Sequence, residues 1–291
     1  MEDYLIRIMA KETGVRGLAC VTTGLANEAA ERHGTTSTTT AVLERALTSG
    51  ILLGALLKVG QRIAVRFEAN GPVGKALVEA DAYGRVSGYL VNPQVDLPLV
   101  ADRPNIVDAL GEIGLLTVVK DLKLKELAEG VVPLQTSTFD GDLTYYLNQS
   151  EQTPSLVVMG EVMGDNGRLQ FSGGVLIQAM PPNDIGIIRQ FIERMQELPP
   201  LEALFVEGKT PEEILALLFA GIEYTELEKR PLRFQCTCSR ERSEKALINL
   251  GRADLQNMLE TEGEAIVDCH FCHERYVFAE EDLRLILVGM D

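Results

Sequence analysis

Residues 236–238 read Cys-Thr-Cys, and residues 269–272 read Cys-His-Phe-Cys. Four of the five cysteines thus form two short pairs in the last fifth of the chain. A tetrahedral Zn²⁺ site needs such pairs, because each supplies two sulfurs from one turn and the fold between them brings the pairs together. Each pair could also close as its own disulfide. The pattern predicts one zinc bound by Cys236, Cys238, Cys269 and Cys272, in a site that doubles as a thiol switch.

Two plainer interpretations of these cysteines stay open from the residues alone. One is a purely structural zinc site. The other is a disulfide framework, which export would favour. However, residues 1–8 lack a basic start followed by an apolar stretch, so we expect a cytoplasmic protein in a reducing compartment. His270 and His273 flank the second pair, but four thiolates already complete a tetrahedron. Cys20 lies alone in an apolar segment and is expected to be a small buried residue.

Length and charge restrict the classes of function. At 291 residues the chain exceeds one average domain, so we expect a large domain and a smaller one. The formal net charge of −16 opposes nucleic-acid binding, which needs a basic face to neutralise phosphates. No apolar run approaches the ~20 residues of a membrane span. Strong negative charge favours solubility, even for a protein that exposes apolar surface.

Residues 1–180 have the pattern of a mixed α+β domain. Alternating apolar segments at 4–9 and 15–21 predict a first hairpin, and Asp165-Asn166-Gly167 predicts a second between strands 155–163 and 169–178. Ser37 is expected to cap a long helix that runs to about residue 57. Strands joined mainly by hairpins imply a largely antiparallel sheet with helices packed against it.

The remaining residues divide into two segments, a helical linker over 181–229 and a zinc-binding domain over 230–291. In the linker, Thr210-Pro211-Glu212-Glu213 predicts a capped helix that is apolar on more than one face. This helix is either an ordinary buried one or part of a segment that docks reversibly. The last segment has few large apolar residues, so metal binding is expected to supply much of its folding free energy.

The cysteine motifs and several turns together resemble one known family. Cys236-x-Cys238-Ser-Arg-Glu-Arg, Cys269-x-Phe-Cys272 and Tyr276-x-Phe278 are similar to the heat-shock protein 33 family of redox-regulated holdase chaperones. Further matching motifs cover nearly the whole chain: Asn70-Gly71-Pro72-x-Gly74, Gly88-Tyr89-x-x-Asn92-Pro93, Val118-Val119-Lys120-Asp121-Leu122, Tyr146-x-x-x-Ser150-Glu151-Gln152-x-Pro154-Ser155 and Gly173-Gly174.

The resemblance implies a cytosolic, ATP-independent chaperone of the oxidative stress response. In its reduced form, four thiolates bind one Zn²⁺ and the protein is inactive. Oxidation joins Cys236 to Cys238 and Cys269 to Cys272, zinc is released, and the tail and linker unfold. The exposed apolar surface then binds unfolding client proteins, and the active form dimerises.

Competing functions find less support in the residues. An enzyme with a structural zinc module remains the main alternative, although the chain has no phosphate-binding G-x-x-x-x-G-K-[ST] or nucleophile G-x-S-x-G motif and only three histidines. A thiol oxidoreductase is a third possibility, but C-x-C followed by a distant C-x-x-C lacks the strand–C-x-x-C–helix context. No catalytic residue is therefore assigned.

Overall fold

The computed structural model describes residues 2–182 and 185–290. Each of the three expected segments contains a position outside the described residues. These positions are 1 in segment 1–180, 183 and 184 in segment 181–229, and 291 in segment 230–291. Contacts divide the chain into two compact units, of which the first ends at Gln235 and the second begins at Cys236. Residues 230–235, placed above with the C-terminal segment, therefore belong to the first unit.

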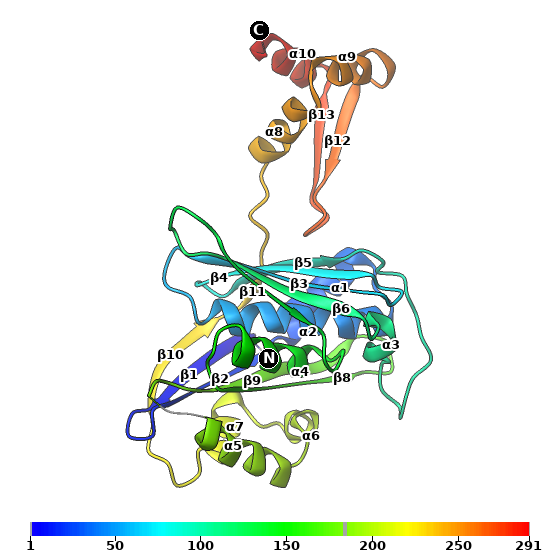
Figure 1. The fold of residues 1–291 in the computed structure, drawn as a ribbon. Helices are drawn as coiled ribbons and strands as arrows, with labels where there is room; N and C mark the ends of the chain where they lie inside the picture. The colour runs from blue at the N-terminus through cyan, green and yellow to red at the C-terminus, as the bar shows by residue number, and fades with distance from the viewer. Residues whose placement is uncertain (1, 183–184, 291) are drawn as a thin grey trace. The chain divides into compact units, whose positions relative to one another are not determined.

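A five-stranded antiparallel sheet forms one layer of the first unit (Figure 1). Its order is β10-β1-β2-β9-β8, and its members are β1 (Tyr4–Ala10), β2 (Val15–Val21), β8 (Ser155–Met163), β9 (Leu169–Ala179) and β10 (Thr225–Pro231). The two hairpins expected from turn residues, β1–β2 and β8–β9, are confirmed. Strand β10 begins inside the expected helical linker, ends two residues beyond it, and was not predicted.

A six-stranded sheet forms a second layer, in the order β11-β5-β4-β3-β6-β7. Its members are β3 (Arg62–Ala69), β4 (Lys75–Asp81), β5 (Arg85–Leu90), β6 (Gly114–Asp121), β7 (Ala128–Pro133) and β11 (Arg233–Phe234). All its pairs are antiparallel except β5–β11. The mixed α+β class with largely antiparallel pairing is thus confirmed, although the strands of the first unit form two sheets rather than one.

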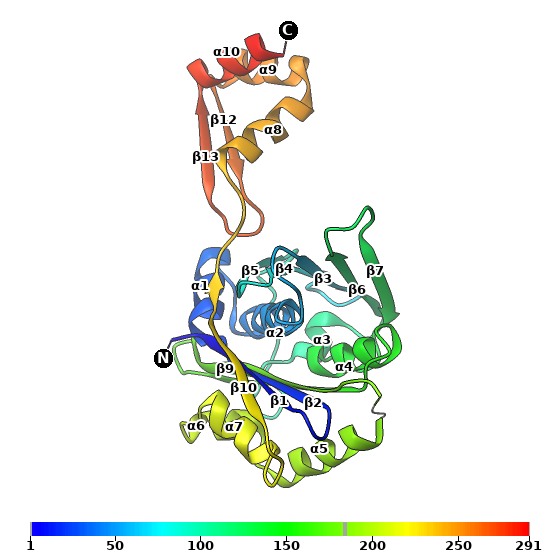
Figure 2. The same ribbon diagram turned by 90° about the vertical axis from the view of Figure 1, so that its left-hand side faces the viewer.

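Helix α2 (Ser37–Gly54) lies between the two sheets and contacts both (Figure 2). Nearly all of its residues are buried, as expected for a helix covered on two faces. Its N-cap is Thr36, whose hydroxyl accepts from the backbone of Thr39, so the cap expected at Ser37 was off by one residue. The same layer contains α1 (Thr23–His33), α3 (Ile106–Leu110) and α4 (Phe139–Gln149).

Three helices cover the other face of the five-stranded sheet: α5 (Ile185–Glu197), α6 (Leu201–Val206) and α7 (Pro211–Leu218). Thr210 and Glu213 form the capping box that the sequence predicted at the start of α7. The second unit consists of α8 (Arg240–Leu250), α9 (Arg252–Thr261), the hairpin β12 (Glu264–Asp268) with β13 (Arg275–Ala279), and α10 (Glu280–Gly289). The Ser239 side chain caps α8, and α10 was not predicted from the sequence.

Candidate metal centre

The second cysteine pair lies in the turn that joins β12 to β13. The backbone N–H of Cys269 donates to the carbonyl of Glu274 (2.9 Å), and the N–H of His273 donates to the carbonyl of Cys269 (2.8 Å). His273 has a left-handed φ of 55°, which allows the chain to reverse so tightly. The hairpin register therefore presents the Cys269 and Cys272 sulfurs on one turn.

The first pair lies in the irregular segment between β11 and α8. Ser239 accepts from the N–H of Arg242 at the start of α8, and the Arg242 guanidinium donates to both the carbonyl and the hydroxyl of Thr237 at 2.9 Å. These contacts fix the backbone of the residue between Cys236 and Cys238. The helix start thus holds the Cys-Thr-Cys segment in one conformation.

The structure brings all four predicted cysteines together, with their sulfurs within 4.8 Å of one another. The Cys236 and Cys269 sulfurs are 3.8 Å apart, and the Cys238 and Cys272 sulfurs 3.4 Å. Four ligands about 2.3 Å from a tetrahedral Zn²⁺ lie about 3.8 Å from each other. The four sulfurs therefore fit a tetrahedral metal site. Neither His270 nor His273 belongs to the cluster that the described residues form.

Two hydrogen-bond donors reach these sulfurs in different ways. The backbone N–H of Cys238 donates to the Cys236 sulfur over 3.4 Å. The Tyr276 hydroxyl, from β13, lies 3.1 Å from the Cys238 sulfur. This tyrosine was not predicted from the sequence as part of the site. Its place two residues before the buried Phe278 was a usable signal, since a tyrosine on the inner face of a strand needs a partner for its hydroxyl.

The thiols differ in how readily they lose a proton. Burial raises the pKa of Cys236 to about 11 and raises that of Cys272 as well. Burial also acts on Cys238, but hydrogen bonds from Tyr276 and from neighbouring thiols outweigh it and lower the pKa of Cys238 below its ordinary value. The surroundings of Cys238 therefore favour its thiolate form, whereas those of Cys236 and Cys272 favour the neutral thiol.

Nearby arginines largely neutralise other groups. Arg240 pairs with Asp282 (2.8 Å) and lies over the ring of Phe278, and Arg275 pairs with Asp268 (2.9 Å). The first pair joins the start of α8 to α10, and the second joins the two strands of the hairpin next to its turn. Arg242 is the arginine that contacts the Cys-Thr-Cys segment directly.

The fifth cysteine has no part in the cluster. Cys20 is fully buried in β2, as expected, and burial raises the pKa of its thiol. It belongs to the first unit, whereas the four clustered cysteines belong to the second.

Comparison with known proteins tests the resemblance drawn from these motifs. The model of the Hsp33 protein family matches residues 3–279. The chain belongs to the heat-shock protein 33 family. It is 48% identical over 281 residues to the 33 kDa chaperonin of Geobacter sulfurreducens, covering 97% of this chain and 93% of that one. The 33 kDa chaperonin of Bacillus cereus is 39% identical over 291 residues, the full length of both chains.

A solved structure supports the same assignment. The Hsp33 homologue of Thermotoga maritima superposes with a TM-score of 0.91 at 30% identity, over 99% of each chain. The relatives are named as chaperonins, so this chain is a chaperone and not an enzyme. Within the described residues, no helix is long and apolar enough to cross a membrane.

Proposed function

We propose that this chain is an ATP-independent holdase whose activity is controlled by oxidation of Cys236, Cys238, Cys269 and Cys272. The observation that carries the proposal is the cluster of four sulfurs within 4.8 Å, contributed by two segments of the second unit. When bound, Zn²⁺ would hold these sulfurs as thiolates and join the two segments. Family membership supports both the metal and the chaperone function.

In this proposal each cysteine pair is a two-electron reductant for a peroxide. One thiolate sulfur attacks a peroxide oxygen, the O–O bond breaks, and the departing hydroxide takes up a proton. The paired thiolate then displaces the sulfenic oxygen, which leaves as water after gaining a proton, and the disulfide forms. Two thiolates, one hydrogen peroxide and two protons thus give one disulfide and two waters. Pairing within Cys236–Cys238 and Cys269–Cys272 leaves no thiolate ligand for the metal.

Loss of the ligands should unfold the second unit because its own core is small. Its buried apolar cluster consists of Leu247, Leu255, Ala265, Phe278, Leu283, Ile286 and Leu287. A unit of about sixty residues buries too little apolar surface to offset its ordering entropy comfortably. The thiolate site joins the Cys-Thr-Cys segment to the hairpin, so its loss removes a constraint that this small core does not replace.

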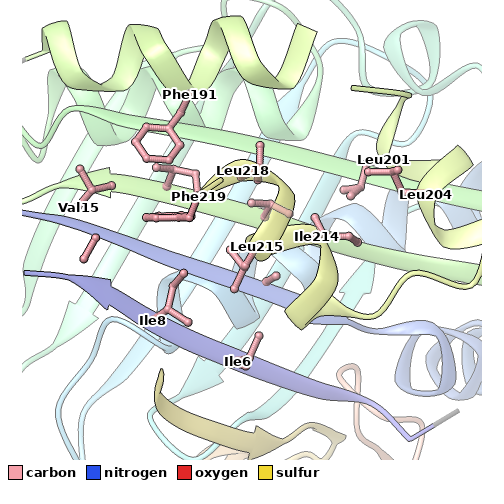
Figure 3. Close-up of a cluster of buried hydrophobic side chains, with 14 of the residues drawn as sticks. Ile6, Ile8, Val15, Phe191, Leu201, Leu204, Ile214, Leu215, Leu218 and Phe219 are labelled. Carbon is pink, nitrogen blue, oxygen red and sulfur yellow. The ribbon is translucent and has the colours of Figure 1, made fainter. Parts of the chain in front are cut away.

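The apolar surface that oxidation would uncover lies between the linker helices and the five-stranded sheet. Figure 3 shows Phe191, Ile214, Leu215, Leu218 and Phe219 packed on the five-stranded sheet. Beneath them, the apolar side chains of β1, β2 and β9 are fully buried: Ile6, Ile8, Ala10, Val15, Ala19, Val21, Val175, Ile177 and Ala179. Removing the helices would expose this face of the sheet, and a contiguous apolar surface of this kind binds unfolded chains.

Strand β10 lies at the C-terminal end of the linker, shortly before the second unit begins. It is an edge strand with mostly exposed side chains, and it pairs only with β1 among the described strands. Its side-chain contacts include ion pairs between Glu228 and Arg7 (2.6 Å) and between Lys229 and Glu212 (2.8 Å). The Lys229–Glu212 pair is largely exposed, and such pairs contribute little, about 0–1 kcal/mol, whereas the Glu228–Arg7 pair is half-buried. On its other edge β10 has no strand partner among the described residues, so we expect it to separate from β1 when the second unit unfolds.

In the same proposal the oxidised form is a homodimer in the cytoplasm, and its partners are unfolding proteins. The net charge of −16 would keep complexes with aggregating clients soluble. The linker over 181–229 acts as the movable segment, although by contacts it belongs to the first unit, which ends at Gln235.

One experiment tests this function directly. Zinc content and free thiols are measured before and after hydrogen peroxide, alongside suppression of aggregation of a thermally unfolding client. We expect one zinc and five thiols in the inactive reduced protein, and no zinc and one thiol in the active oxidised protein. Client protection by the fully reduced, zinc-bound protein equal to that by the oxidised protein would contradict redox control.

A further inference from the structure

Tyr276 joins the two cysteine segments by a side-chain contact. The residue lies on β13 opposite Val267 of β12, in the hairpin whose turn presents Cys269 and Cys272. Its hydroxyl nevertheless reaches the other segment and lies 3.1 Å from the Cys238 sulfur. The same Cys238 sulfur lies 3.4 Å from the sulfur of Cys272. The phenol thus adds a polar link between the segments at one particular sulfur.

A phenol O–H that donates to a sulfur withdraws charge from it. Hydrogen bonds to a metal ligand fix its orientation and alter its reactivity, and bonds to a charged acceptor are the stronger kind. The backbone donor at Cys236 is longer, at 3.4 Å. A thiolate with less charge on sulfur attacks a peroxide oxygen more slowly. The hydrogen bond should therefore slow oxidation of Cys238 in particular.

We propose that Tyr276 is a positioning residue that protects the Cys238 thiolate from peroxides and so raises the amount of oxidant needed to complete the switch. This inference rests on the proposed redox function. The protected step is the attack of the Cys238 sulfur on a peroxide, in which an S–O bond forms, the O–O bond breaks and the released hydroxide is protonated. The Tyr276 O–H···S bond must break or weaken for that attack to proceed.

Tyr276→Phe tests the proposal, because it removes one oxygen and keeps the ring. Tyr224→Phe is the matched control, since it removes a phenol oxygen from the first unit. Both proteins are first measured for zinc content and free thiols, which establishes whether the four-thiolate site exists. The zinc-loaded proteins are then exposed to limiting hydrogen peroxide, and oxidation of each cysteine is followed by differential alkylation and mass spectrometry.

We expect Cys238 to be oxidised about threefold to tenfold faster in Tyr276→Phe, the change that loss of one hydrogen bond gives. Cys272 should be less affected, and Tyr224→Phe should match the unaltered protein. In the Co²⁺-substituted Tyr276→Phe protein, the sulfur-to-metal charge-transfer band should move to lower energy, because the sulfur regains charge. A purely packing role for the ring would neither accelerate Cys238 selectively nor move this band.

Several results would overturn the proposal. One is an unchanged rate of Cys238 oxidation in a folded, zinc-bound Tyr276→Phe protein. Another is equal acceleration of oxidation at all four cysteines together with weaker zinc binding, which would indicate a packing role. If the variant does not fold, Tyr276→3-fluorotyrosine keeps the hydroxyl and makes it a better donor, so Cys238 should then react more slowly. If Cys238 in the 3-fluorotyrosine variant were oxidised at the same rate as in the unaltered protein, the proposal would be wrong. Failure of the unaltered protein to bind zinc through four thiolates would instead contradict the proposed function.

Discussion

The Cε2 atom of Phe219 lies 2.8 Å from the point that a Cβ atom on Gly17 would occupy. The ring at the end of α7 therefore rests on bare backbone of β2. Phe219 also contacts Phe191 of α5, with ring centroids 4.8 Å apart. Phe219 thus packs α5 and α7 against the sheet at a position where a side chain on residue 17 would clash with its ring.

Replacing Gly17 with alanine should loosen the linker without touching the cysteines. The added methyl group would meet Phe219, Leu215 and Ile8 at 2.8–3.1 Å, so α7 must shift, at a cost of about 1–3 kcal/mol. We expect faster proteolysis within residues 185–224 and partial client protection by the reduced, zinc-bound protein. Gly289→Ala is the control, because no atom lies within 4 Å of its added methyl group. Proteolysis of Gly17→Ala as slow as that of this control would contradict the docking role of Phe219.

A truncated chain should act as a chaperone without oxidation. We expect a chain that ends at Gln235 to suppress client aggregation even when fully reduced, because nothing then holds β10 and the linker through the second unit. The endpoint matters: Leu232 and Phe234 are buried in the first unit, and ending at Pro231 would remove both. A folded truncated protein that is inert with clients, beside an active oxidised full-length protein, would exclude an inhibitory role for the second unit.

The site could be predicted from the sequence because its ligands lie close together in two short motifs. The spacing of Cys236 with Cys238, and of Cys269 with Cys272, is a local property of the chain. Tyr276 was missed because a local pattern shows only that its hydroxyl needs a partner. Which partner it finds depends on how the hairpin meets a segment about forty residues earlier.

Strand β10 was missed for a different physical reason. Its sequence, Thr-Glu-Leu-Glu-Lys-Arg-Pro, is charged and has no alternating apolar face, because an edge strand can leave both faces in water. Its partner β1 lies more than two hundred residues earlier. The β1–β2 and β8–β9 hairpins, by contrast, are local and carry alternating patterns or a strong turn. The split into two sheets likewise depends on non-local pairing around α2.

The ligand set predicts how single substitutions affect zinc. Cys269→Ser should weaken zinc binding at least about a hundredfold, since it removes one of four thiolates. His270→Ala should retain one zinc, because the cluster in the described residues consists of cysteines alone. Competition with a chromogenic chelator measures both. The reverse result, with zinc retained in Cys269→Ser and lost in His270→Ala, would exclude our ligand set.

The disulfide map tests the pairing within each cysteine motif. All four sulfurs lie within 4.8 Å of one another, and those of Cys238 and Cys272 are 3.4 Å apart, so the folded unit also permits cross-pair bridges. Short sequence separation gives each thiolate a high local concentration of its near neighbour, and it still does so after loss of the metal unfolds the unit. We expect peptide mapping to find Cys236–Cys238 and Cys269–Cys272, with Cys20 still reduced. Dominant Cys238–Cys272 linkage would contradict this pairing.

A buried carboxyl on α2 should make the stability of the first unit depend on pH. Glu44 is fully buried, and burial raises its pKa to about 8. The hydroxyls of Thr22 and Thr48 donate to its Oε1, whereas its Oε2 has no hydrogen-bond partner among the described residues. The neighbouring Arg45 is itself paired with Glu161 (2.8 Å) and Asp140 (3.4 Å). The neutral acid is therefore the form that fits this core.

Because the folded state binds this proton more tightly than the unfolded chain does, the stabilisation is full below about pH 4.5 and is lost as the pH rises towards about 8. Glu44→Gln keeps the size and an acceptor oxygen but cannot ionise. We expect its stability relative to the unaltered protein to increase by roughly 2–4 kcal/mol between about pH 5 and pH 8. Urea unfolding of the chain ending at Gln235, with and without the substitution, isolates this effect from the metal site. A constant difference in unfolding free energy across that range would mean that Glu44 is already ionised in the folded protein.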